Sequence, residues 1–158
     1  MRAGAVSRAR GRPGPGRARA GEDRLRAAGV LVRRAGPADD GPLQDALRGS
    51  WPETWVTETA AALRSDQGGV HIAVQGRQYA GFCAYGVSRH HEIGPIGTDP
   101  RLRRLGIGAV LLRRCLAEQR DRGLASADIG WAGPLSFFSR TVHASISRAF
   151  WCYDKEIS

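Results

Sequence analysis

The sequence predicts one mixed α/β domain built on a largely antiparallel sheet. Its 158 residues, of which 42% are hydrophobic, suit a single domain with one core. Apolar periodicities predict the order strand, two helices, three strands, helix, strand, helix, strand along residues 30–155. This order is typical of helices layered on a mostly antiparallel sheet.

The first strand is expected at Val30–Arg34. A turn at residues 36–40 then leads into a helix from about Leu43 to Arg48. Trp51-Pro52 interrupts the helical pattern, which returns from Trp55 to Arg64 with apolar residues on one stripe.

The middle of the chain predicts three strands in succession. Val70–Gln75 and Tyr79–Ser88 are expected to form a hairpin across Gly76-Arg77. Glu92–Thr98 is the third strand, and Gly94-Pro95 interrupts it. Because proline lacks a ladder donor and glycine weakens a strand, this pair predicts a bulge or a gap in pairing that leaves backbone groups for a ligand.

The last elements alternate helix and strand. A helix is expected from about Gly106 to Arg122, where Gly123 ends it. Ala125–Trp131 is a further strand, Pro134–Thr141 a short helix, and Ile146–Lys155 a final strand rich in aromatic residues.

Most of the net charge of +9 lies in the first 28 residues. They hold eight arginines against Glu22 and Asp23, which accounts for six of the nine charges. Since they contain almost no large apolar side chain, we expect residues 1–28 to be a disordered tail and residues 29–158 to form the domain. The tail leaves nucleic-acid binding as an alternative function, but its lack of interleaved aromatic residues argues against it.

Composition also argues against membrane, secreted and metal-binding classes. No apolar run approaches the length of a membrane span and no secretory signal is evident, so we expect a cytoplasmic protein without a membrane partner. Cys83, Cys115 and Cys152 form no CxxC pair and lie among apolar neighbours, which indicates reduced, buried thiols. The four histidines and three cysteines show no recurring spacing, so no metal site is expected.

Residues 99–112 read DPRLRRLGIGAVLL, a basic turn and two glycines that open into an apolar helix directly after a strand. The first N–H groups of a helix have no intrahelical acceptor and lie at the positive end of its dipole, so they can bind a phosphate. Gly106 and Gly108 have no side chain that would keep an anion from the backbone. The segment therefore predicts a phosphate-bearing cofactor.

This segment resembles the acetyl-CoA signature of the GNAT superfamily of N-acetyltransferases, Arg/Gln-x-x-Gly-x-Gly/Ala, and the element order resembles that family over roughly residues 30–157. The resemblance implies a mixed α/β fold of the α+β type. Its mostly antiparallel sheet has about six strands, carries helices on both faces, and is splayed at the cofactor strand. The resemblance also implies acetyl-CoA as co-substrate. By this resemblance the residues that bind the pyrophosphate are Arg103, Arg104, Gly106, Ile107, Gly108 and Ala109. The strand residues whose backbone binds the rest of the cofactor are Ile96 and Thr98.

Acetyl transfer to a primary amine requires a base, because alkyl amines are mostly protonated at neutral pH and an ammonium has no lone pair. Glu92 lies 11 residues before Arg103, where histone-acetylating relatives keep a glutamate base. It is our candidate catalytic residue. His90 and His91 adjoin it, and an imidazole titrates in the useful range, but we expect a surface or pairing role for either histidine rather than catalysis. A solvent-facing strand carboxylate is the alternative for Glu92 itself.

The general acid departs from the family pattern. Many relatives place a tyrosine in a Phe-Tyr pair at the start of the last helix, whereas this chain has Phe137-Phe138, and Phe138 has no hydroxyl. Ser136, Ser139, Tyr153 or water stay open as proton donors.

Two further departures bear on activity. Trp131 stands where many members have asparagine, and His143 where a glycine is usual. Two functions therefore remain in view. One is an N-acetyltransferase that acts on a small-molecule, peptide or protein amine by direct attack in a ternary complex. The other is a non-catalytic CoA-binding regulatory protein of the same fold.

Aromatic residues outside the signature have two interpretations. In the family, the first helix pair and the middle strands form the acceptor pocket, so Trp51, Trp55 and Tyr85 are candidates to line it. Aromatic residues at helical spacing more often belong to the core, which we expect for Trp55, while Trp51 stays open. The aromatic final strand is suited to pairing across a homodimer.

Overall fold

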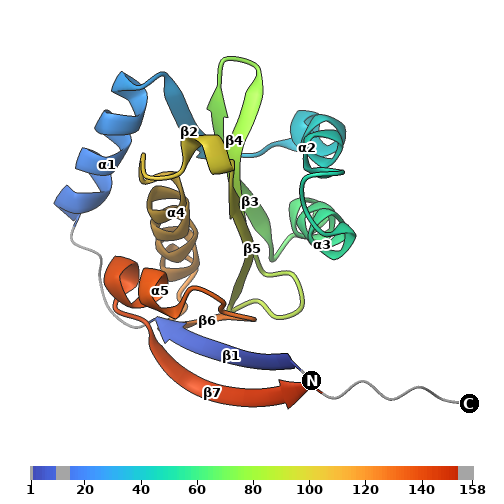
Figure 1. The fold of residues 1–158 in the computed structure, drawn as a ribbon, viewed down its shortest axis with the longest axis vertical. Helices are drawn as coiled ribbons and strands as arrows, with labels where there is room; N and C mark the ends of the chain where they lie inside the picture. The colour runs from blue at the N-terminus through green and yellow to red at the C-terminus, as the bar shows by residue number, and fades with distance from the viewer. Residues whose placement is uncertain (1, 10–14, 153–158) are drawn as a thin grey trace, which may run out of the picture.

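In the computed structural model, which describes residues 2–9 and 15–152, seven strands form one sheet in the order β2-β3-β4-β5-β6-β1-β7 (Figure 1). All neighbouring strands with assigned pairing run antiparallel except β5 and β6, which are parallel. The mostly antiparallel sheet is therefore confirmed. The strands are β1 (Arg2–Ala9), β2 (Val30–Arg34), β3 (Gly69–Gln75), β4 (Gln78–Tyr85), β5 (Glu92–Thr98), β6 (Ala127–Ile129) and β7 (Ser145–Cys152).

Helices cover both faces of the sheet, as expected: α2 and α3 lie on one side, and α1 and α4 on the other (Figure 1). The pleat explains how one strand serves both layers, because successive side chains of β4 point to opposite faces. Phe82 packs in the α2–α3 core, while Cys83 and Tyr85 pack in the α4 core. No helix in the described ranges is long and apolar enough to cross a membrane. The helices are α1 (Pro15–Ala27), α2 (Asp40–Leu47), α3 (Glu53–Arg64), α4 (Ile107–Asp121) and α5 (Leu135–Val142).

The N-terminal residues differ from the prediction. Residues 1–28 were expected to form a disordered tail, but β1 lies between β6 and β7 in the sheet, and α1 packs beside α4. Leu25 of α1 is only 1% exposed, and Glu22 forms an ion pair with Arg114 of α4 at 2.5 Å. The tail needs no core of its own, because β1 is held by backbone pairing to two strands and α1 by a helix of the domain.

The sheet opens between β5 and β6. These strands pair only at Glu92 with Asp128 and at Ile93 with Ile129, while β5 continues to Thr98 along β4 alone. The opening begins at Gly94-Pro95, where the sequence predicted a gap in pairing. Strand β6 is shorter than the expected Ala125–Trp131: it begins at Ala127 and ends at Ile129, and the left-handed backbone of Trp131 (φ 48°) is incompatible with extended structure at that residue. The splay is therefore confirmed, and after Ile93 one backbone edge of β5 has no strand partner among the described residues.

Candidate active site

The N-terminus of α4 follows β5 through a basic turn. Gly106 is the N-cap and has φ 87°, a left-handed conformation that glycine adopts without strain. The backbone N–H of Val110 donates to the carbonyl of Gly106 at 3.1 Å. The N–H groups of Ile107, Gly108 and Ala109 precede this bond and have no acceptor within the helix. They form a set of donors at the positive end of α4.

The space around these donors suits a phosphate chain. A Cβ on Gly106 would meet no atom within 4 Å, so the surface there is open. A Cβ on Gly108 would lie 3.3 Å from Thr98 Oγ1 and 3.5 Å from Phe137 Cζ, so a larger side chain would enter the gap between β5 and α5. Arg103 and Arg104 are exposed beside it and add positive charge. The residues present therefore fit the diphosphate of a nucleotide cofactor.

The strand residues expected to contact the cofactor lie on the open part of β5. Ile96 pairs with Cys83 and Thr98 with Gly81, both of β4. Their other edge faces the gap left by β6, so its backbone groups are available to amide groups of a ligand.

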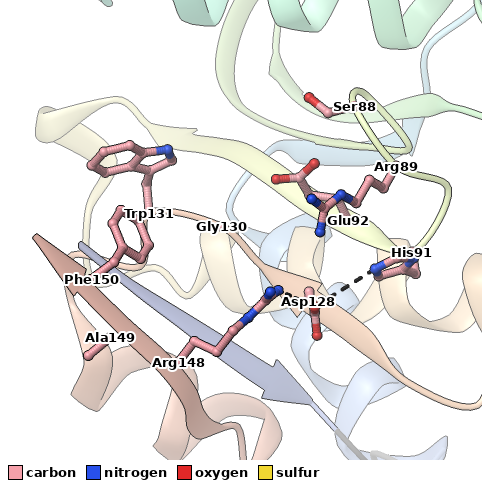
Figure 2. A pocket seen from close by; sticks show the side chains of 10 residues that line it. All are labelled: Ser88, Arg89, His91, Glu92, Asp128, Gly130, Trp131, Arg148, Ala149 and Phe150. Carbon is pink, nitrogen blue, oxygen red and sulfur yellow. Dashed lines mark hydrogen bonds and ion pairs between the residues drawn. The ribbon is translucent and has the colours of Figure 1, made fainter. Parts of the chain in front are cut away.

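A pocket of about 500 Å³ lies at the opposite end of β5 (Figure 2). The loop before β5, the end of β6 and the strand β7 contribute its walls. Glu92 lines this pocket, whereas the Arg103–Ala109 segment does not. The structure thus separates the predicted base from the predicted phosphate site by the length of one strand. The lining residues are Ser88, Arg89, His91, Glu92, Asp128, Gly130, Trp131, Arg148, Ala149 and Phe150.

Glu92 is half-buried, and the carboxylate lies over Gly130. A Cβ on Gly130 would stand 2.7 Å from Glu92 Oε1, so the missing side chain makes room for the carboxylate. Burial, together with the negative charge of Glu92, raises the pKa of Glu58 on α3. Glu58 therefore lies close enough to Glu92 for the two negative charges to repel each other.

Gln119 holds the backbone around Glu92, a role that we did not predict from the sequence. It is 1% exposed on α4, and its Nε2 donates to the carbonyls of His90 at 3.0 Å and Glu92 at 3.2 Å. The available signal was a polar residue one helical turn beyond Cys115 on the apolar stripe of α4. A buried amide requires partners. Here Nε2 finds them at the loop residue His90 and at Glu92, the first residue of β5, while Oε1 accepts no hydrogen bond from a described residue.

Asp128 is surrounded by positive groups. Arg8 Nε lies 2.9 Å from its carboxylate, Arg148 Nη2 lies 3.5 Å from it, and His91 Nε2 lies 3.8 Å from it. Figure 2 shows Arg148 and His91 beside Asp128. The Arg8 hydrogen bond is the main reason that the pKa of Asp128 is lowered. His91 is therefore directed at Asp128, which leaves Glu92 as the carboxylate that faces the pocket without an ion pair among the described residues.

Trp131 and Phe150 form an aromatic wall at one end of the pocket. Their rings meet edge to face with centroids 4.9 Å apart, and Trp131 is 63% exposed. A large exposed indole on a left-handed backbone is unusual, and such positions cluster at functional sites. The sequence showed Trp131 only as a departure from the family pattern.

The other aromatic candidates lie outside the pocket. Tyr85 is fully buried on the α4 side, so the interpretation that it lines the pocket is wrong. Trp51 and Trp55 stack with centroids 5.4 Å apart and pack in the α2–α3 core, which confirms the prediction for Trp55. A Cβ on Gly97 would stand 2.8 Å from Trp51 Cη2, so Trp51 packs against the C-terminal end of β5.

The candidate proton donors near α5 are placed as follows. Phe138 is 3% exposed and packs in the α4 core. Ser136 and Ser139 are exposed, and Tyr153 lies outside the described residues. No phenol in the described part of α5 takes the place of the family's tyrosine.

Comparison with known proteins identifies a family. The sequence profile described as "Acetyltransferase (GNAT) family" matches residues 42–132. No curated protein matches the chain.

Solved structures with the same fold share little sequence with this chain. The GCN5-related glucosamine N-acetyltransferase region of a fungal multi-domain GH3 β-N-acetylglucosaminidase has a TM-score of 0.72 at 15% identity, over 94% of this chain and 20% of that one. A putative GNAT-family acetyltransferase from Novosphingobium aromaticivorans has a TM-score of 0.61 at 17% identity, over 94% and 62%. The aminoglycoside acetyltransferase meta-AAC0020 from an uncultured soil metagenomic sample, in complex with trehalose, has 0.59 at 16%, over 82% and 98%. This chain thus spans less than two thirds of the length of the first two proteins. At these low identities the similarity shows a shared fold and nothing more.

Proposed function

Because this chain belongs to the GNAT acetyltransferase family, we propose that it transfers the acetyl group of acetyl-CoA to a primary amine by direct attack in a ternary complex. One observation carries the proposal: the open edge of β5 runs from the donor-rich N-terminus of α4 to the pocket around Glu92. A cofactor bound at the N-terminus of α4 can present its acyl end near Glu92.

The residues that would hold acetyl-CoA are those of the signature. The free N–H groups of Ile107, Gly108 and Ala109, the space at Gly106, and the charges of Arg103 and Arg104 suit its pyrophosphate. The free edge of β5 at Ile96 and Thr98 suits its amide-bearing arm. Bound acetyl-CoA supplies the acetyl group as a thioester.

Glu92 is the proposed general base. It accepts the proton of the acceptor amine, directly or through a water, so that the nitrogen gains the lone pair that the reaction requires. Gly130 provides the space for its carboxylate, and Gln119 fixes its main chain. His91 is directed at Asp128 and has the lesser claim. We assign the proton for the departing sulfur to solvent, because Phe138 is buried and has no hydroxyl.

Phe138 also favours a second candidate, a CoA-binding regulatory protein without catalytic activity. Both functions require cofactor binding, and only the first requires turnover. Amine-dependent release of CoA separates them.

The test measures CoA release from acetyl-CoA with a panel of primary amines. We expect turnover that depends on the amine, and we expect Glu92→Gln to lower kcat by about 10²- to 10⁴-fold, the usual contribution of a general base. Glu53→Gln, on an exposed carboxylate at the start of α3, is the matched control and should keep the wild-type rate. Cofactor binding without turnover on any amine would favour the non-catalytic CoA-binding protein over the transferase, and a wild-type rate in Glu92→Gln would remove Glu92 as the base.

A further inference from the structure

The charges that line the pocket identify a class of acceptor. Glu92, Asp128, Arg89 and Arg148 contribute two negative and two positive charges. Asp128 is already compensated by Arg148 and by Arg8 from β1. Glu92 and Arg89 are the lining charges that form no ion pair with another described residue.

Arg89 is held at a defined position relative to Glu92. The two residues lie three apart in a turn that the N–H of Glu92 closes onto the carbonyl of Arg89 at 2.9 Å. The N–H of Gly86 donates to the carbonyl of Glu92 at 2.8 Å, and Gln119 binds the carbonyl of His90 between them. This segment therefore presents a guanidinium and a carboxylate to the same cavity from a backbone fixed at several points (Figure 2).

A free guanidinium in a pocket recognises a planar anion. Its forked N–H groups match the two oxygens of a carboxylate, and these charge-assisted bonds are stronger than neutral ones. A free carboxylate nearby suits an ammonium group. An acceptor with an amine and an acidic group close together would satisfy both side chains at once.

The aromatic wall of Trp131 and Phe150 adds a third feature. It offers an apolar surface in the same cavity, where an acceptor can place an apolar side chain. Arg8, Arg89 and Arg148 outnumber the carboxylates of Glu92 and Asp128 by one, and this net positive charge disfavours an amine with several positive charges.

We propose that the acceptor is an amino acid or a compound like it, with an acidic group beside the reactive amine and an apolar side chain. Arg89 binds the acidic group, Glu92 faces the amine, and the side chain lies on the wall of Trp131 and Phe150. This inference rests on the proposed function and names the acceptor class of the same site.

The test compares amines that differ by one group. L-Phenylalanine and phenethylamine differ only in the carboxylate, and we expect kcat/KM to be about tenfold or more higher for L-phenylalanine, the effect of one charge-assisted hydrogen bond. In Arg89→Gln this ratio should fall toward one. Arg77→Gln, at an exposed arginine of the β3–β4 turn, is the control and should keep the wild-type ratio.

Two further comparisons test the wall and the charge. The kcat/KM for L-phenylalanine should exceed that for L-alanine in the wild type, and this preference should disappear in Trp131→Asn, which removes the indole from the wall. Asparagine is the chosen replacement because it tolerates the left-handed backbone at that position. Spermidine, a polycationic amine, should be a poorer acceptor than L-phenylalanine.

The outcomes separate the inference from the function on which it rests. Equal turnover of phenethylamine and L-phenylalanine, an unchanged ratio in Arg89→Gln, or a preference for spermidine would overturn the acceptor class and leave acetyl transfer intact. Absence of turnover with every amine, while acetyl-CoA binds, would overturn the transferase proposal and the acceptor class with it.

Discussion

Three glycines determine how closely ligands and side chains approach in this site. Gly106 allows the left-handed turn into α4 and leaves open space, and Gly108 keeps the gap beside Thr98 clear. Gly130 makes room for the carboxylate of Glu92. The first two were predicted from the sequence, because the signature marks them. Gly130 was not, because its role depends on a neighbour 38 residues away in the chain that only the parallel pairing of β5 and β6 brings close.

At the residue scale, we predict that Gly130→Ala lowers kcat and leaves stability nearly unchanged. The new Cβ would stand 2.7 Å from Glu92 Oε1, so the flexible carboxylate must move away. Displacement of a catalytic group by about 1 Å lowers rates by roughly up to 10²-fold. Steady-state kinetics and thermal unfolding measure the two effects.

The matched control is Gly133→Ala, in the same loop, where a Cβ would meet no atom within 4 Å. This variant should keep the wild-type kcat. If Gly130→Ala does so too, the position of the Glu92 carboxylate does not limit the reaction.

At the element scale, α4 serves both ends of the site. Its first turn supplies the N–H groups proposed to bind phosphate, and Gln119 in its last turns binds the carbonyls of His90 and Glu92. The apolar stripe of Ile107, Leu111 and Cys115 packs this helix against the sheet. One helix therefore fixes the distance between the proposed cofactor site and the proposed base.

The elements were largely predicted because apolar periodicity is a local signal. Strands β2 to β5 and helices α3 and α4 lie within a few residues of the expected bounds. The contacts of the pocket were not predictable in the same way, because the partners of Asp128 come from β1, β7 and the loop before β5. Sequence spacing carries no information on such contacts between distant segments.

A carboxylate at the start of α2 yields a pH prediction. Asp39 accepts hydrogen bonds from Arg33 Nη1 and Nη2 at 2.7 Å each, from the N–H of Gly36 at 2.8 Å and from Tyr79 Oη at 3.1 Å. The Arg33 bonds are the main cause that lowers the pKa of Asp39 to about 2. Because the folded pKa lies below the unfolded one, this stabilisation is complete above about pH 4 and is lost as the pH falls toward 2.

We predict that Asp39→Asn lowers the free energy of unfolding by about 2 kcal/mol at neutral pH. The difference from the wild type should shrink as the pH falls from about 4 toward 2, as chemical denaturation at several pH values would show. Asp45→Asn, at a carboxylate that is 74% exposed, should change stability by less than about 1 kcal/mol. A pH-independent difference for Asp39→Asn would show that charge is not the cause.

At the scale of the whole molecule, the N-terminal strand completes the sheet. β1 joins β6 to β7, and β7 pairs with β1 alone among the described strands. This arrangement was not predicted, because a segment of arginine, glycine and alanine has the composition of a tail. Its order comes from backbone pairing with strands more than 100 residues away in the chain.

We predict that deletion of residues 1–9 lowers the melting temperature by more than about 5 °C, since β7 loses its partner strand and Asp128 loses Arg8. Arg8→Gln, which removes the ion pair and keeps the strand, should have a smaller effect. An unchanged melting temperature in the deletion variant would show that β1 does not stabilise the sheet. Thermal unfolding of the three proteins side by side makes the comparison.

The proposed acetyl transfer requires acetyl-CoA to bind at the N-terminus of α4, and calorimetric titration with acetyl-CoA tests this directly. Gly106 and Gly123 lie just outside opposite ends of the same helix, both have left-handed backbones (φ 87° and 90°), and a Cβ on either would meet no atom within 4 Å. Glutamate therefore carries the same backbone cost at both positions, and only at Gly106 would it repel the pyrophosphate. We predict that the wild type and Gly123→Glu bind acetyl-CoA and that Gly106→Glu does not. Wild-type affinity in Gly106→Glu, or no binding by the wild type at millimolar acetyl-CoA, would show that the N-terminus of α4 does not hold the pyrophosphate.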